Sequence, residues 1–186
     1  AALRLLAQLN GLALDDPRIT EVAQLTGADV PVCVRSLACV MTGVGETLQP
    51  LDLPTMPCVM VNPCVPVATR DVFNALGLRN GELLVGAADV LLQDSSWPDE
   101  GGSLEEWVEA LAANSNDLEA PATRIEPVIG EVIAALNGTN GAWLARMSGS
   151  GATCFAIYEN TAEARRAAEK IRRQQPGWWV HAGVLS

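Results

Sequence analysis

The sequence has few of the residues that several kinds of functional site require. Its 186 residues include one histidine, His181, and one lysine, Lys170. A single histidine excludes a multi-histidine metal site and gives little support to a Ser-His-Asp triad. The patterns G-x-x-x-x-G-K-[ST], H-E-x-x-H and the EF-hand loop are absent as well. The chain therefore contains no P-loop and no metal site of those two kinds.

Positive charge and long apolar runs are also scarce. The 12 Lys and Arg residues stand against 22 Asp and Glu residues, which gives a net charge of −10. Such a chain lacks the wide basic face that binds nucleic acid, so we expect no nucleic-acid partner. No run approaches the roughly 20 apolar residues that a membrane span needs, and no signal-peptide pattern occurs. We therefore expect a soluble, unsecreted protein without membrane contacts, located in the cytoplasm.

What the chain does contain is enough apolar material for a core. Hydrophobic residues make up 49% and charged residues 18%, which excludes overall disorder and fits one domain, or one domain and part of another. None of the five cysteines forms a C-x-x-C pair. Their odd number favours a reducing compartment over a disulfide framework. Four have apolar neighbours and are expected to be buried: Cys33, Cys39, Cys58 and Cys154.

The first residues have the pattern of a helix without a proper start. Residues 1–12 carry apolar side chains at Leu5, Leu9 and Leu12, but no Ser, Thr, Asp or Asn precedes them as a cap. The chain also opens with Ala1 rather than Met. Either upstream sequence is missing, which we favour, or the first turn frays after removal of Met.

Further elements follow from caps, breakers and periodicity. An apolar strand is expected soon after Asp29, and 77–102 should be irregular, with apolar patches at 83–85 and 90–92. From residue 58 onward the order is βαββαβ with one extra helix, which predicts a ferredoxin-like α+β sandwich. The other strands are expected at 38–42, 47–50, 58–61, 141–147, 153–158 and 178–184. The helices are expected at 17–25 (capped by Asp16), 69–76 (capped by Thr69), 103–113 (with a Ser103–Glu106 capping box), 123–136 and 161–174 (capped by Asn160).

Two features could carry chemistry. Asp29 lies in GADVP (27–31), between a helix end and an apolar run, where a carboxylate needs a partner or a function. A turn or cap residue is the alternative. The run SGSGAT (148–153) lies between two strands, and its glycines could direct N–H groups toward an anion. A plain hairpin turn is the alternative there, because Met147 replaces the first glycine of a G-x-S-x-G elbow.

These segments together strongly resemble the GHMP kinase superfamily, over essentially the whole chain. The resemblance is carried by GADVP (27–31), GVGE (43–46), residues 63–73, NDLE (116–119) and SGSGAT (148–153). GADVP followed by GVGE is specific to the branch that acts on a cytidine-diphosphate derivative of methylerythritol, whereas SGSGAT is a more general motif. The resemblance implies an α+β fold of two parts. Residues 1–54 would be the carboxyl-terminal part of the first, ribosomal-protein-S5-domain-2-like domain, and 55–186 the ferredoxin-like second domain.

The activity that the resemblance implies is phosphorylation of the substrate's 2-hydroxyl by ATP with Mg²⁺, in non-mevalonate isoprenoid biosynthesis. The location would be the bacterial cytoplasm or the plastid stroma, and no residue is assigned as a metal ligand. Two other functions remain open. One is a non-enzymatic ferredoxin-like domain that binds a small molecule, and the other is a different GHMP kinase, such as a mevalonate-pathway or homoserine kinase.

The resemblance also implies roles for individual residues. Asp29 would be the catalytic aspartate, and Phe73 would stack on the cytosine, although a core phenylalanine is the alternative. Thr69 would contact substrate in the same segment. The loop near the substrate diphosphate and the domain interface would consist of Ser148, Gly149, Ser150 and Gly151. The family's active-site lysine and ATP phosphate loop have no counterpart here, and Lys170 matches neither. The chain alone is therefore expected to be inactive, and it could reassociate with the missing amino-terminal segment.

Overall fold

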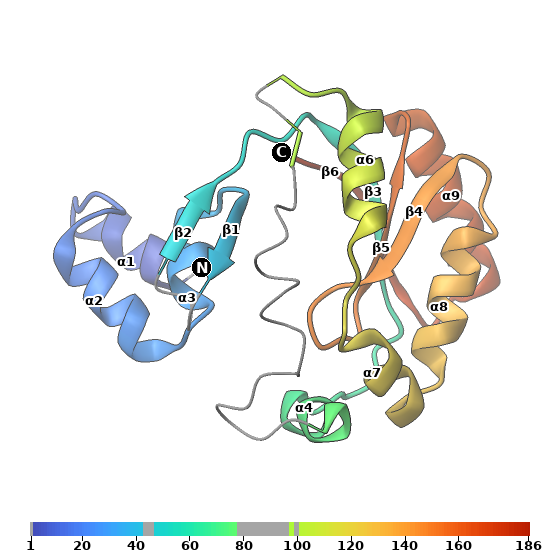
Figure 1. Cartoon of the computed structure of the whole chain (residues 1–186), viewed down its shortest axis with the longest axis horizontal. Coiled ribbons are helices and arrows are strands. Elements are labelled where there is room, and N and C mark those ends of the chain that lie inside the picture. The colour runs from blue at the N-terminus through green and yellow to red at the C-terminus, as the bar shows by residue number, and fades with distance from the viewer. Residues whose placement is uncertain (1, 43–46, 78–96, 99–100) are drawn as a thin grey trace. The chain divides into compact units, whose positions relative to one another are not determined.

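The computed structural model describes residues 2–42, 47–77, 97–98 and 101–186 (Figure 1). The GVGE segment and the apolar patches expected at 83–85 and 90–92 lie outside the described residues. The chain divides into two compact units, Ala1–Leu53 with Ser186, and Pro54–Leu185. Each unit combines helices with an antiparallel sheet, in agreement with the expected α+β class.

The first unit consists of three short helices followed by a hairpin. The strands pair antiparallel from Cys39 opposite Pro50 to Thr42 opposite Thr47. Both strands and the first two helices were predicted from the sequence. The elements are α1 (Ala2–Leu9), α2 (Pro17–Thr26), α3 (Val30–Arg35), β1 (Cys39–Thr42) and β2 (Thr47–Pro50).

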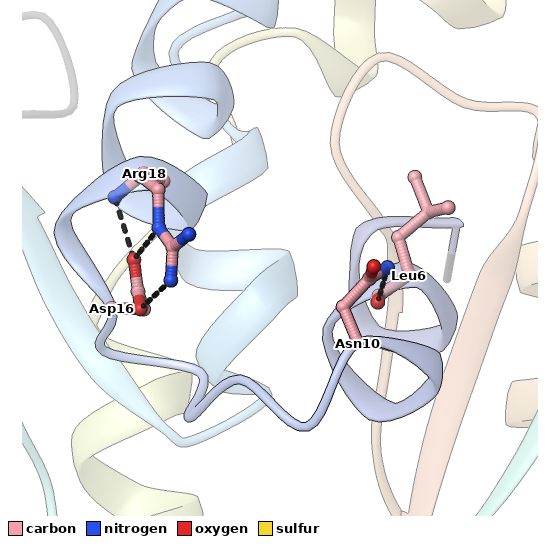
Figure 2. Close-up of polar contacts among 4 residues, drawn as sticks. All are labelled: Leu6, Asn10, Asp16 and Arg18. Atoms are coloured by element: carbon pink, nitrogen blue, oxygen red, sulfur yellow. Dashed lines mark hydrogen bonds and ion pairs between the residues drawn. The ribbon is translucent and has the colours of Figure 1, made fainter.

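The start of α2 has the predicted cap. The Asp16 carboxylate accepts hydrogen bonds from the Arg18 backbone N–H at 2.9 Å and from the Arg18 guanidinium at 3.0 and 2.8 Å (Figure 2). Pro17 occupies the first helical turn, where its missing N–H costs nothing. These hydrogen bonds from Arg18 lower the pKa of the Asp16 carboxyl from 3.8 to about 2. At the end of α1, the Asn10 amide donates to the Leu6 carbonyl at 2.8 Å (Figure 2).

The core of the first unit is small. Its buried apolar residues are Ala7, Ile19, Ala23 and Val34. The helix over residues 2–9 was expected, but of its predicted apolar stripe only Leu12 packs against this core. Leu9 is 73% exposed, and Leu25 on α2 is 81% exposed. The described residues thus leave much of the unit's apolar surface uncovered.

The expectation of an apolar strand after Asp29 is wrong, because this segment forms the helix α3. Its first turn contains Pro31, whose fixed φ suits a helix start, and the Cys33 N–H donates to the Asp29 carbonyl at 3.2 Å. A short apolar run has no periodicity that separates a strand from a helix. Cys33 is exposed as a consequence, whereas its neighbour Val34 is buried.

The second unit is built on a four-stranded antiparallel sheet in the order β4-β5-β3-β6. This strand order is that of the expected ferredoxin-like sandwich. Helices α8 and α9 cover one face of the sheet, and α6 contacts β4 from the other side (Figure 1). The strands are β3 (Met56–Asn62), β4 (Ala142–Met147), β5 (Cys154–Tyr158) and β6 (Trp179–Leu185). The helices are α4 (Thr69–Leu76), α6 (Leu104–Ala113), α7 (Glu119–Ile125), α8 (Val128–Asn137) and α9 (Thr161–Gln174).

Two of these helices begin at the caps that the sequence predicted. In the Ser103–Glu106 capping box, the Ser103 N–H donates to the Glu106 carboxylate at 2.7 Å, and the Glu106 N–H donates to the Ser103 hydroxyl at 3.2 Å. The Asn160 side chain accepts from the Glu163 N–H at 3.0 Å. The single helix expected over 123–136 is wrong, because Pro127 separates α7 from α8. A proline inside a helix removes one hydrogen bond and disfavours helical geometry in the residue before it.

The core of the second unit lies between the sheet and α8 and α9. Val59, Val61, Ile129 and Ile171 are among its fully buried residues. Where α8 ends, the Lys170 ammonium on α9 donates to the Gly138 carbonyl at 2.8 Å. A cation is favourable there because the last carbonyls of a helix lack intrahelical partners. Of the helices in the described part of the chain, none has the length and apolarity to cross a membrane.

Candidate substrate site

The Gly/Ser segment forms the connection between β4 and β5. The Ser148 N–H donates to the Thr153 carbonyl at 2.9 Å, and the Gly151 N–H donates to the Ser148 carbonyl at 3.1 Å. Gly149 and Gly151 have φ angles of +56° and +89°, in the region that favours glycine. The segment is therefore a hairpin turn, and its tight backbone explains both glycines.

Thr69 lies beside this turn. Its hydroxyl is 2.9 Å from the Ser150 hydroxyl, although the two residues are 81 positions apart. The prediction that Thr69 caps α4 is wrong, because Ala68 holds the N-cap position and Thr69 is the first helical residue. With its hydroxyl not engaged in capping, Thr69 links α4 to the turn. The structure thus brings together two segments that the sequence analysis had assigned to one site.

Phe73 follows Thr69 by one helical turn and lies on the same side of α4. Its side chain is 48% exposed, while Val72 beside it is fully buried. The core position of α4 therefore belongs to Val72, and the alternative of a core phenylalanine is wrong. The exposed ring is available to a flat ligand.

Asn116, between α6 and α7, and Glu119, the first residue of α7, bond to the turn and to the end of β4. The Asn116 amide donates to the Met147 carbonyl at 3.0 Å and to the Gly149 carbonyl at 2.8 Å, and its oxygen accepts from the Leu118 N–H at 3.1 Å. The Glu119 carboxylate accepts from the Met147 N–H at 2.9 Å. Both residues belong to the NDLE run, but the sequence alone indicated no role for either. A polar run ahead of a helix indicates a cap, but it does not reveal partners about 30 positions away.

Asn62, at the end of β3, holds the other side of the turn. Its amide donates to the Thr153 hydroxyl at 2.9 Å, and its side-chain oxygen accepts from the Cys64 N–H at 2.7 Å. Cys154 begins β5 and is buried. Burial, with a smaller effect from the Glu119 charge, raises the pKa of the Cys154 thiol to about 12. Cys154 therefore stays a neutral thiol near neutral pH and contributes packing rather than a nucleophile.

Asp29 belongs to the first unit. It occupies the N-cap position of α3 with φ −82° and ψ −9°, but its side chain makes no capping hydrogen bond. The carboxylate is exposed. The alternative of a capping aspartate thus matches its position but not its bonding.

A metal site within the chain would need several ligands close together. Among the described residues, no group of three or more His, Cys, Asp or Glu side chains could hold a metal ion. Mg²⁺ is commonly held by one or two carboxylates together with substrate phosphates.

Comparisons with known proteins agree with the resemblance seen in the sequence. Residues 99–177 match the family model described as GHMP kinases C terminal. All 186 residues align with a 4-diphosphocytidyl-2-C-methyl-D-erythritol kinase of Bradyrhizobium diazoefficiens at 71% identity, covering 62% of that protein. A protein of the same name from Nitrobacter hamburgensis is 66% identical and is covered to 61% of its length. The chain therefore spans about three fifths of the curated relatives it matches.

Solved structures extend these matches to the fold. A crystal structure of 4-(cytidine 5'-diphospho)-2C-methyl-D-erythritol kinase matches 98% of the chain with a TM-score of 0.68 and 32% identity, and 61% of that protein is covered. Homoserine kinase from Cytophaga hutchinsonii matches 97% of the chain with a TM-score of 0.67, and 61% of it is covered. At 20% identity, the second likeness concerns the fold alone.

Proposed function

The chain belongs to the GHMP kinase family, and from this premise we propose that it forms the larger part of a 4-diphosphocytidyl-2-C-methyl-D-erythritol kinase. The complete enzyme would transfer the γ-phosphate of ATP to the 2-hydroxyl of 4-diphosphocytidyl-2-C-methyl-D-erythritol, in non-mevalonate isoprenoid biosynthesis. The observation that carries the proposal is the 71% identity, over all 186 residues, to a relative of that name.

In this proposal, the second unit binds the substrate. The exposed Phe73 ring offers a π-face to the cytosine, and stacking of a base on an aromatic side chain contributes about 1–3 kcal/mol. Thr69 lies on the same side of α4 and reaches Ser150, so both segments can contact one ligand. The turn Ser148–Gly151 would then lie near the substrate diphosphate.

Asp29 would orient or deprotonate the hydroxyl that attacks the γ-phosphate. Phosphoryl transfer depends mainly on positioning and charge stabilisation, so one well-placed carboxylate can have a large effect. The absence of a capping bond on Asp29 supports this role, because its oxygens are not engaged in the helix start. When bound with ATP, Mg²⁺ would neutralise charge at the phosphates.

The remaining part of the kinase would be the partner of the first unit. The exposed Leu9 and Leu25 support this, because the described residues leave them uncovered and apolar side chains gain stability when buried. Reassociation with that part would complete the enzyme. The bacterial sources of the relatives support a bacterial cytoplasmic location over the plastid stroma.

The two alternatives explain less. A non-enzymatic ferredoxin-like binding domain would account for the sheet of the second unit, but not for a match that extends over the first unit to proteins named as kinases. A homoserine kinase would account for the fold, but the likeness to one is limited to 20% identity.

The test uses a complete enzyme. The part of the Bradyrhizobium diazoefficiens relative that this chain does not match is fused to the chain, at the position that this part has in the relative. ADP release is then measured with ATP and the proposed substrate. Asp29→Asn should lower kcat by about 10²-fold or more, because the acceptor hydroxyl loses its carboxylate, while ATP binding persists.

Asp15→Asn is the matched control. Asp15 is another exposed carboxylate of the first unit, and it lies before α2. The Asp15→Asn substitution should leave kcat close to that of the enzyme without substitutions. Absence of turnover in the unchanged enzyme would contradict the proposed function, whereas full activity of Asp29→Asn would contradict only the role of Asp29.

A further inference from the structure

We propose that Asn116 is a positioning residue that fixes the Ser148–Gly151 turn from outside the ligand site. The kinetic consequence rests on the proposed function, while the structural part stands without it. Hydrogen bonds from two described side chains reach the four residues of the turn. Thr69 bonds to the Ser150 hydroxyl, and Asn116 bonds to the Gly149 backbone carbonyl. Asn116 is thus the side chain that acts on the turn's backbone.

The bonding of Asn116 leaves its side chain no freedom to turn over. Its two N–H groups are directed at the Met147 and Gly149 carbonyls, and its oxygen accepts from the Leu118 N–H. A flipped amide would place oxygen against two carbonyl oxygens and N–H against N–H. One orientation therefore satisfies every partner, so the side chain is a rigid link between the start of α7 and the turn.

The bond to Gly149 sets the direction of a backbone donor. In a trans peptide, the carbonyl of one residue and the N–H of the next point in opposite directions. Because the Gly149 carbonyl points at Asn116, the Ser150 N–H points away from it. Among the described residues, no backbone carbonyl accepts a hydrogen bond from the Ser150 N–H. The geometry thus presents this donor to an anionic ligand, and Asn116 holds it in that direction.

The contact matters because little else restrains the Gly149–Ser150 peptide. Gly149 has no neighbouring atom within 4 Å of where a Cβ would be, so packing does not hold it. Its positive φ is one of several conformations that a glycine adopts easily. Without the Asn116 bond, we expect the Gly149–Ser150 peptide to rotate and the donor to lose its fixed direction.

Asn116→Asp tests the proposal at nearly constant shape. It retains an oxygen for the Leu118 N–H, and its charge suits the start of a helix. It replaces the donor with an oxygen that faces two carbonyl oxygens. The matched control is Asn114→Asp, because Asn114 lies in the same connection and its amide donates to the Ala110 carbonyl at 2.8 Å.

The first readout uses the 186-residue chain and needs no substrate. Amide hydrogen exchange and ¹H–¹⁵N spectra are recorded for Gly149, Ser150 and Gly151. Asn116→Asp should shift these resonances and raise the Gly151 exchange rate about tenfold or more, and Asn114→Asp should not. If Asn116→Asp fails to fold, Asn116→Ser serves instead, because the serine hydroxyl can still accept from the Leu118 N–H but is too short to reach the turn.

The second readout uses the complete enzyme described above. Asn116→Asp should lower kcat by about 10- to 100-fold, because small displacements of positioning groups have effects of that size. Unfolding midpoints should show that both variants remain folded at the assay temperature, so that a loss of kcat confined to Asn116→Asp reports the turn rather than loss of the fold. Equal spectra and equal kcat in the two variants would overturn the proposal. If the complete enzyme without substitutions shows no turnover, the proposed function is contradicted. The spectral test of Asn116 is then still valid, because it needs no substrate.

Discussion

At the scale of single residues, the two glycines of the β4–β5 turn differ in what surrounds them. Both have positive φ, but a Cβ on Gly149 would meet open space. A Cβ on Gly151 would lie 2.9 Å from the Met147 sulfur and 3.3 Å from a methyl carbon of Ile129. Gly149 is therefore required by the backbone alone, and Gly151 by the backbone and the core together.

This difference predicts unequal stability of two matched variants. Gly149→Ala should lower the free energy of unfolding by about 1 kcal/mol, the cost of a left-handed alanine. Gly151→Ala should lower it by about 2–4 kcal/mol, because crowding of a packed core adds to that cost. Urea unfolding followed by tryptophan fluorescence measures both, since all five tryptophans lie within 97–179 in the second unit. Equal losses would contradict the contact at Gly151.

At the scale of elements, the sequence predicted features that depend on neighbouring residues. The caps at Asp16, Ser103 and Asn160 were found because a side chain and its N–H partner lie two or three positions apart. The strand order followed from the βαββαβ pattern. Such features are local or set by topology, so one sequence is enough to find them.

Two of the errors share a cause, which is competition between structures that the local pattern does not decide, whereas Pro127 is a local signal that separates α7 from α8. The apolar run of α3 suits a strand or a helix equally. The Thr69 hydroxyl does not cap α4 but forms a hydrogen bond with the Ser150 hydroxyl, 81 positions away. In the site, Phe73, Thr69 and the turn came from a family resemblance. The hold of Asn116 on the turn could not be found, because only the folded chain brings those residues together.

The start of α2 predicts a dependence on pH. The lowered pKa of Asp16 means that the folded state favours the charged carboxylate. The stability that the charged Asp16 carboxylate gives to the folded state is therefore present above pH 3.8 and is lost as the pH falls toward 2. The ¹³C shift of the Asp16 carboxyl, followed from pH 6 to pH 1.5, should show a midpoint near 2.

The control for that titration is Arg18→Ala, which removes the guanidinium bonds. The Asp16 midpoint should then rise toward 3.8, since the side-chain hydrogen bond from Arg18 is the largest cause of the shift. The same midpoint in both proteins would show that the Arg18 guanidinium does not lower the pKa of Asp16.

At the scale of the whole molecule, the two units differ in how far each can stabilise itself. The second has a four-stranded sheet with a continuous core, whereas the described part of the first has a two-stranded hairpin and a core of four buried apolar residues. A two-stranded hairpin is only marginally stable by itself in water.

The net charge of −10 adds a constraint on function. In the proposed kinase, this chain would contribute backbone N–H groups and helix ends to anionic ligands rather than a basic surface.

We accordingly predict that the 186-residue chain alone does not turn over ATP and substrate. The chain spans about 62% of its relative and contains no P-loop or other segment assigned to the ATP phosphates. ADP release should stay at the level of a blank without protein. Addition of the unmatched part of the relative as a separate polypeptide should raise it, and turnover by the chain alone would contradict the prediction.

The bond between Lys170 and the end of α8 has a practical consequence. Since Lys170 is the only lysine, the chain offers a single ε-amine to any reagent that acylates side-chain amines. A surface that couples through that amine would hold every molecule at the same point of α9. Acylation would also remove the positive charge that donates to the Gly138 carbonyl. The amide resonances at the end of α8 should therefore shift when Lys170 is coupled.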